Sequence, residues 1–239
     1  EDIKFVFDSE KNQFNIFQNK PGARAFFYKG MLKDLDINFH GYAEEFTNEL
    51  ANYPVDQRGL TGCLSLIHLK VSNLKINSSN SSCEDTVNLI NVVGTFGEIN
   101  IKDSFSDGLD VDFSEVEIDR INIFSSRNDC ADFSAGKYKL NELNLTNCGD
   151  KGLSVGEKSV LQLNEIVVEN SDIGIASKDS SIIKMESAYL KNLKTCVSAY
   201  NKKQEFYGGL LEAKNLKCKN YVYKTNIDAH SKIIIENEF

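Results

Sequence analysis

The chain has few of the residues that characterise several common protein classes. Its 239 residues include no tryptophan, two prolines and three histidines. So little proline argues against a loop-rich binding domain, because proline is one of the residues that shape turns and loops. No apolar run approaches the roughly 18 residues that a membrane-spanning helix needs. We therefore expect no membrane insertion.

Basic residues are also in the minority. Lysine and arginine total 27 against 35 aspartates and glutamates, which gives a formal net charge of −8 and a pI of about 5.0. Nucleic acids and anionic membrane surfaces both attract clustered positive charge. The charge balance therefore argues against either kind of partner.

The cysteines lack the closely spaced pairs that are typical of zinc sites. The nearest two, Cys130 and Cys148, are 18 residues apart. Small buried side chains are the favoured interpretation. One or two disulfides are the alternative, since an even number of cysteines suits an exported protein. The six positions are Cys63, Cys83, Cys130, Cys148, Cys196 and Cys218.

The chain begins at Glu1, and no segment near it resembles a signal peptide. We expect a processed form or an excised module of a larger protein, whose other domains are then possible partners. Length alone allows one or two domains, and the 41% of apolar residues can fill a sizeable core.

An internal repeat of 22 residues governs the middle of the chain. In each repeat two apolar positions flank one polar or small position, which is the alternation of a β-strand with one buried face. The first apolar column is Val87, Leu109, Ala131, Leu153, Ile175 and Val197. The second is Leu89, Val111, Phe133, Val155, Ser177 and Ala199. The column between them, expected to face outward, is Asn88, Asp110, Asp132, Ser154, Ala176 and Ser198.

The second half of each unit carries another short alternation, as in FGEINIKDS and IDRINIFSS. A unit of this length cannot bury its own apolar face, so the copies must stack into a solenoid. Leucine-rich repeats need a fixed LxxLxL consensus, which is absent. The expected fold is an all-β parallel β-helix with coils of about 22 residues.

We expect one domain over residues 1–239, with irregular coils over 1–61 and regular coils from 62 onward. Residues 41–62 lack alternation and predict a long excursion, with a helical turn near residues 43–50. A shorter excursion is expected at residues 201–209, and IIIEN near the C-terminus predicts a last strand.

The coils over about residues 62–222 resemble those of the right-handed parallel β-helix, pectin-lyase-like superfamily. The strings GDKGLSVGE, ASKDSS and AYNKKQEF are similar to those of uncharacterised bacterial β-helix proteins. The superfamily includes pectate lyases, polygalacturonases, epimerases and adhesive modules, so the resemblance implies a polysaccharide or glycan partner. The paired-Asp and GHG signature of polygalacturonases and the Arg-centred motif of pectate lyases are missing. No catalytic residue is therefore carried over.

The repeat gathers carboxylates on one side of the fold. Asp110 and Asp132 share the outward column, so their Cα atoms should lie about 5 Å apart. A second column precedes the strand at its bend, and it consists of Asp85, Asp107, Asp129 and Lys151. Asp112 faces outward two residues after Asp110. Further residues expected on the same side are Glu157, Lys178, Asp179, Lys202, Lys203 and Glu205, with Lys178 and Asp179 as a solvated ion pair.

Three interpretations of this acidic patch stay open. Some aspartates can bond backbone amides at the bends, which is a structural role. A cation, most plausibly calcium, can bind carboxylate oxygens, and its candidate ligands are Asp107, Asp110 and Asp132. Paired carboxylates can also catalyse glycan hydrolysis, because neighbouring carboxyl groups displace one another's pKa values.

The candidate catalytic residues are Asp107, Asp110, Asp112, Asp129 and Asp132. The candidate substrate-binding residues are Asp85, Lys151, Glu157, Lys178, Lys202 and Tyr200. An acidic surface repels a polyuronate, so a lyase needs calcium, or Lys151 and Arg127, beside its substrate.

The sequence thus predicts a carbohydrate-interacting module, extracellular or at the cell surface, that binds or processes a polysaccharide by hydrolase or lyase chemistry. Whether it is an enzyme stays open. The alternative is a non-catalytic structural or adhesive module of a larger bacterial surface protein, in which the aspartates serve the turns.

Overall fold

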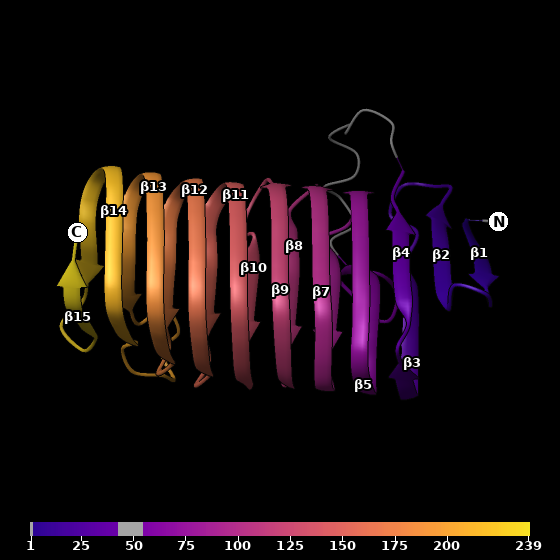
Figure 1. Cartoon of the computed structure of the whole chain (residues 1–239), viewed down its shortest axis with the longest axis horizontal. Helices are drawn as coiled ribbons and strands as arrows, with labels where there is room; N and C mark the ends of the chain where they lie inside the picture. Colours follow the sequence, from indigo (N-terminus) through magenta and orange to yellow (C-terminus); the bar gives the residue numbers. More distant parts are fainter. Residues whose placement is uncertain (1, 43–54) are drawn as a thin grey trace.

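The computed structural model describes residues 2–42 and 55–239. The helical turn predicted for residues 43–50 lies outside this part of the chain. The described residues form strands, turns and loops and no helix, and hence no helix that could span a membrane. Figure 1 shows the strands standing side by side along the long axis, with the two termini at opposite ends. The predicted all-β parallel β-helix is confirmed.

The strands of the described residues form one sheet that winds through the whole stack. β1 and β2 pair antiparallel, and the pairs that follow are parallel. Their bounds are β1 Ile3–Asp8, β2 Gln13–Gln18, β3 Ala25–Lys33, β4 Asp36–His40, β5 Gly62–Ser81, β6 Asp85–Ile90, β7 Val93–Ser104, β8 Asp107–Asp112, β9 Glu115–Ser126, β10 Ala131–Ser134, β11 Lys137–Gly156, β12 Val160–Lys178, β13 Ile182–Tyr200, β14 Leu210–Ile227 and β15 Lys232–Glu238.

The register of the ladder confirms the 22-residue period. On β8, Leu109 pairs with Val87 of β6 on one side and with Ala131 of β10 on the other. The same column continues through Leu153 and Ile175 into β11 and β12. Each coil therefore places equivalent residues directly above one another, about 4.8 Å apart.

The two predicted apolar columns lie inside the stack. Leu109 and Val111 are fully buried, as are their equivalents on the neighbouring coils. One continuous core cluster runs from Ile16 to Leu216. Burying apolar surface stabilises a fold by about 25 cal/mol per Å². This free energy favours stacking, because no single coil can cover its own apolar face.

Asparagines occupy one corner of the C-terminal coils. Asn147, Asn170, Asn192 and Asn220 all have left-handed backbone conformations, with φ between 53° and 61°. Asparagine tolerates this region better than most residues. The amides of Asn170, Asn192 and Asn220 also each donate a hydrogen bond of 2.8–3.0 Å to the asparagine of the preceding coil. The corner is thus held both by backbone preference and by a ladder of side chains.

All six cysteines form disulfides, so the favoured interpretation as unpaired buried residues was wrong. The pairs are Cys63–Cys83, Cys130–Cys148 and Cys196–Cys218. The alternative interpretation, one or two disulfides, gave too small a number, because three form. Most of these cysteines are buried, as expected.

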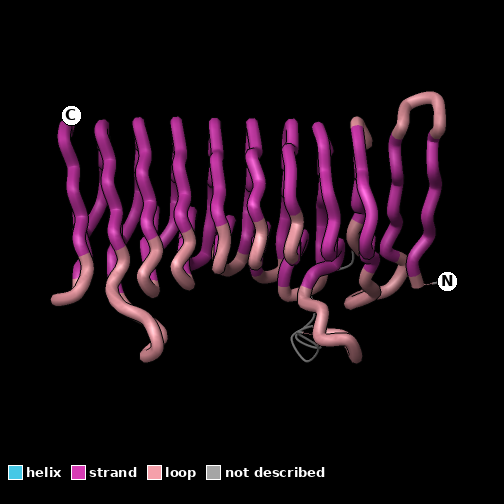
Figure 2. Tube along the Cα trace, turned by 90° about the horizontal axis from the view of Figure 1, so that it is seen from below, coloured by secondary structure: helices cyan, strands magenta, loops and turns pink. Residues whose placement is uncertain are grey.

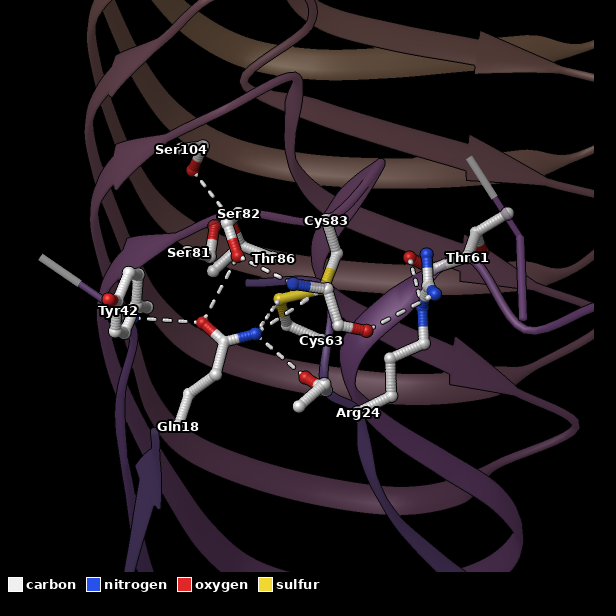
Figure 3. Close-up of a disulfide and its surroundings, with 12 residues drawn as sticks. Gln18, Arg24, Tyr42, Thr61, Cys63, Ser81, Ser82, Cys83, Thr86 and Ser104 are labelled. Atoms are coloured by element: carbon white, nitrogen blue, oxygen red, sulfur yellow. Dashed lines mark hydrogen bonds between the residues drawn. A yellow bond between two sulfur atoms is a disulfide. The ribbon is translucent and has the colours of Figure 1, made fainter. Parts of the chain in front are cut away.

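Gln18 anchors the N-terminal coil to the first disulfide (Figure 3). Its Nε2 lies 3.4 Å from Cys63 Sγ and donates a 2.7 Å hydrogen bond to the carbonyl of Ala23. Its Oε1 accepts hydrogen bonds from Ser82 Oγ and from the backbone N–H of Tyr42. The irregular N-terminal coils therefore continue the same stack.

Turns gather along one edge of the stack, and longer loops project from it (Figure 2). The predicted excursion at residues 201–209 connects β13 to β14. The last strand predicted at IIIEN is β15, which pairs with β14. Both predictions are confirmed.

Candidate functional site

The column predicted to face outward forms a straight row across the coils. We call it the outward row, and its members are Ser65, Asn88, Asp110, Asp132, Ser154, Ala176 and Ser198. Asp110 pairs in register with Asn88 and with Asp132, so the predicted adjacency of the two aspartates is confirmed.

The outward row is not the solvated surface that the sequence predicted. Ser65, Ser154 and Ser198 are fully buried, and Asn88 is only 1% exposed. Asp110 and Asp132 are half-buried. Two neighbouring columns flank the row: the bend column of Asp85, Asp107, Asp129 and Lys151, and the strand-end column of Asp112, Ser134, Gly156, Lys178 and Tyr200.

Lys178 shows how the row is covered. Its side chain lies over Gly156, where an added Cβ would meet Lys178 Cε at 3.4 Å. Its Nζ reaches back to 3.5 Å from Asp132 Oδ2, two coils away, and the side chain is only 7% exposed. The small residues in the strand-end column therefore leave room for a long side chain from a later coil.

The covered row keeps several polar atoms without hydrogen-bond partners. They are Ser65 Oγ, Asn88 Oδ1, Asp132 Oδ1, Ser154 Oγ and Ser198 Oγ, together with Asp85 Oδ2 beside the row. A buried polar atom without a partner costs about 1–3 kcal/mol, and such atoms are uncommon in folded proteins. Five of the eight buried side-chain atoms without partners among the described residues therefore lie in this one row.

Asp107 and Asp129 have structural roles. Asp107 Oδ1 accepts a 2.9 Å hydrogen bond from the backbone N–H of Asp129. Asp129 Oδ1 in turn accepts one of 3.0 Å from the N–H of Lys151, and it also lies 3.2 Å from Lys151 Nζ. Lys151 additionally contacts Asp150. These bonds fasten each bend to the next coil, as one interpretation of the patch predicted.

Asp110 is the most crowded carboxyl group of the row. Burial raises its pKa well above the usual value, and the nearby Asp85, Asp112 and Asp132 raise it further. Asn88 Nδ2 donates a 2.9 Å hydrogen bond to Asp110 Oδ2. Burial also raises the pKa of Asp112, although hydrogen bonds with Asp110 and Asn88 oppose the change.

Asp85 and Asp107 have pKa values near neutrality. Burial raises the pKa of each to about 7, and neighbouring carboxylates add to the effect. The hydrogen bond with Thr61 opposes the change at Asp85. Carboxyl groups in this range hold a proton for much of the time at neutral pH, which is the condition for general acid catalysis.

Charges are balanced differently at the C-terminal side of the row. Burial lowers the pKa of Lys151, but Asp129 and Asp150 outweigh it, so the net shift is upward. Burial raises the pKa of Tyr200, and the nearby Lys151 opposes this. Lysines therefore offset carboxylates over β10 to β12, and no comparable ion pair joins the described residues over β6 and β8.

Two predicted substrate-binding residues lie away from the row. Glu157 pairs with Lys203 of the 201–209 loop. Lys202 is exposed, and its backbone N–H donates to Asp179 Oδ1 at 2.7 Å. Asp179 is buried and serves this loop, whereas Lys178 pairs with Asp132. The predicted solvated ion pair between Lys178 and Asp179 was therefore wrong.

Within residues 2–42 and 55–239, no three histidine, cysteine, aspartate or glutamate side chains form a group that could hold a metal ion. The carboxylates of the patch are spread along several coils instead. Calcium stays a prediction for this site.

Sequence reasoning missed Asn88 and the serines of the outward row as functional candidates. The 22-residue period already placed Asn88 in the column of Asp110 and Asp132. What the sequence did not show is that Asn88 Oδ1 is buried without a partner. That property depends on side chains from neighbouring coils.

Comparison with models of protein families, with curated proteins and with solved structures finds no significant match. The parallel β-solenoid is thus established by the strand register itself.

Proposed function

We propose that the chain is a carbohydrate-interacting module that binds a polysaccharide along the outward row. The observation that carries this proposal is the line of buried polar atoms without partners, which runs along the axis of the stack from Ser65 to Ser198. A linear polymer of sugars offers hydroxyl groups at regular intervals, so one chain can supply partners to several coils at once.

Binding requires the cover to move. Lys178 is long and flexible, and its contact with Asp132 at 3.5 Å is a single ion pair. We infer that an outward swing of Lys178 breaks this ion pair and frees the carboxyl group of Asp132 for a bound sugar. The resemblance to the pectin-lyase-like superfamily, many of whose members act on polysaccharides, supports the same partner class.

Processing of the bound glycan by hydrolase or lyase chemistry is part of the proposal. Asp107, with a pKa of about 7, can hold a proton near neutral pH, as a general acid must. Asp110 and Asp132 lie on adjacent coils, so their spacing suits the pair of carboxyl groups in a retaining glycosidase.

A structural or adhesive module of a larger surface protein is the second candidate. It is favoured by the hydrogen bonds from the backbone of one coil to Asp107 and Asp129 of the coil before. In that case the carboxylates hold the bends together and do not contact a ligand.

The three disulfides support an extracellular or cell-surface location, because disulfides persist in oxidising compartments and are rare in the cytosol. This location suits both candidate functions. Mass spectrometry of the protein from its native source, with and without reduction, tests the location through the state of the cysteines.

A glycan array and a reducing-sugar assay with the double variant Asp110→Asn/Asp132→Asn test the function. We expect the parent to bind at least one glycan class and the variant to lose at least about tenfold in affinity, because the two carboxyl groups proposed to contact the glycan are removed. Asp119→Asn on β9 is the matched control, since Asp119 is exposed and outside the row. Unchanged binding in the double variant, with a lower melting temperature, would favour the structural module instead.

A further inference from the structure

The acidic half of the site consists of Asn88 and Asp110 of the outward row together with the flanking Asp85, Asp107 and Asp112, and it differs from the rest of the site. Asp85, Asp107, Asp110 and Asp112 lie on β6 and β8, and none of them forms an ion pair with a described residue. Arg24 attracts Asp85 electrostatically, and its guanidinium also donates to the carbonyls of Thr61 and Gly22. This half therefore groups four carboxyl groups without an ion-pair partner among the described residues, and their raised pKa values keep part of them protonated near neutral pH.

The unpartnered atoms of this half are all acceptors. Asp85 Oδ2 and Asn88 Oδ1 have no hydrogen-bond partner, and their residues are 3% and 1% exposed. Asn88 is tied to the cluster by its 2.9 Å bond to Asp110. A ligand that satisfies these oxygens must bring hydrogen-bond donors, and one that stabilises the carboxylates must also bring positive charge.

From this arrangement we propose that the half of the outward row on β6 and β8 selects glycans that carry free amino groups. The inference rests on the proposed glycan-binding function and names the class of sugar that this half would take. A protonated amine is a compact cation with three donors, so one ammonium group can contact a carboxylate and Asn88 Oδ1 together.

Other ligands fit the same features less well. A neutral sugar supplies donors but leaves the repulsion among the carboxylates in place. A polyuronate adds negative charge to an acidic face. A single metal ion needs ligands that converge on one point, whereas the described carboxylates form no such group and repeat about every 4.8 Å along the stack. A polymer with one amine per sugar likewise presents its cations along a line.

Isothermal titration calorimetry at about pH 6, where an amine is protonated, tests the inference. The probes are a β-1,4-linked glucosamine oligosaccharide, its fully N-acetylated form of equal length, and an oligogalacturonate. We expect the amino form to bind about tenfold or more tightly than the acetylated form, and the galacturonate to bind most weakly. Binding of the amino form should release protons, since a nearby cation favours the ionised carboxylate.

The variant Asp110→Asn should reduce the preference for the amino form to about threefold or less, and Asp119→Asn should leave it unchanged. Asp112→Asn provides a second test if Asp110→Asn fails to fold, as judged by its melting curve. Equal affinity for the amino and acetylated forms would overturn this inference while glycan binding itself stands. Absence of binding to every glycan on the array and to all three probes would overturn both.

Discussion

Replacing Asp107 by asparagine should reduce the pH dependence of the unfolding free energy. Burial raises the pKa of Asp107 to about 7, so the folded protein keeps this proton while the unfolded chain has lost it. The folded state therefore binds more protons between about pH 4 and pH 7, and stability falls as the pH rises through that window. Above pH 7 both states are ionised and the loss is complete.

The size of the effect follows from the displacement of the pKa. The change from 3.8 to about 7 is roughly three pH units. Each unit corresponds to about 1.4 kcal/mol, so the proton on Asp107 accounts for at most about 4 kcal/mol between pH 4 and pH 8. The asparagine at position 107 keeps an Oδ1 that can accept a hydrogen bond from the backbone N–H of Asp129. The hydrogen bond that fastens the bend is therefore retained.

Urea unfolding of the parent and Asp107→Asn at about pH 4, 5.5, 7 and 8, with the disulfides intact, measures this difference. The two proteins should have similar stability at the lowest pH, and the variant should be more stable by about 2–4 kcal/mol at the highest. Asp85 and Asp110 titrate in both proteins, but the Asp107 charge raises both of their pKa values, so its removal lowers their cost at high pH and changes the difference in the same direction. The assigned burial of this carboxyl group would be refuted if the unfolding free energy fell by the same amount in both proteins between pH 4 and pH 8. It would also be refuted if the parent were the more stable protein at pH 8.

Three further perturbations test other parts of the fold. Leu109→Ala should destabilise the protein by about 2–5 kcal/mol in denaturant unfolding, because Leu109 is fully buried; a loss below 1 kcal/mol would contradict its place in the core. Replacing Cys130 and Cys148 together by serine should cost about 3 kcal/mol, since their disulfide closes a loop of 18 residues; reduction of the parent should then lower its melting temperature too. Lys178→Met should cost about 1–3 kcal/mol in urea unfolding at neutral pH, because the ion pair with Asp132 is lost; an unchanged stability would argue against that pair.

The repeat made the fold predictable from the sequence. Val87, Leu109 and Ala131 recur at one period and are apolar, so stacking equivalent positions is the arrangement that buries them all. The same period placed Asp110 beside Asp132, and the register confirms it. Strand pairing in a solenoid depends on this local regularity, which is written directly in the sequence.

The pairing of the cysteines was not predictable in the same way. Cys130 and Cys148 belong to different columns of the repeat, and their sulfur atoms meet only because the chain turns a corner between them. The geometry of that corner depends on how the coils pack. Spacing along the chain therefore left the disulfides as one of two interpretations.

For the candidate site, too, the sequence determined one part and the tertiary structure the other. The sequence determined which residues share a column, and hence that Asn88, Asp110 and Asp132 lie in one row. Only the tertiary structure decided that this row is buried, that Asp107 and Asp129 fasten the bends, and that Lys178 reaches Asp132 across Gly156. The physical reason is that a column follows from the period alone, whereas burial and charge compensation depend on side chains that arrive from coils 22 or 46 residues away.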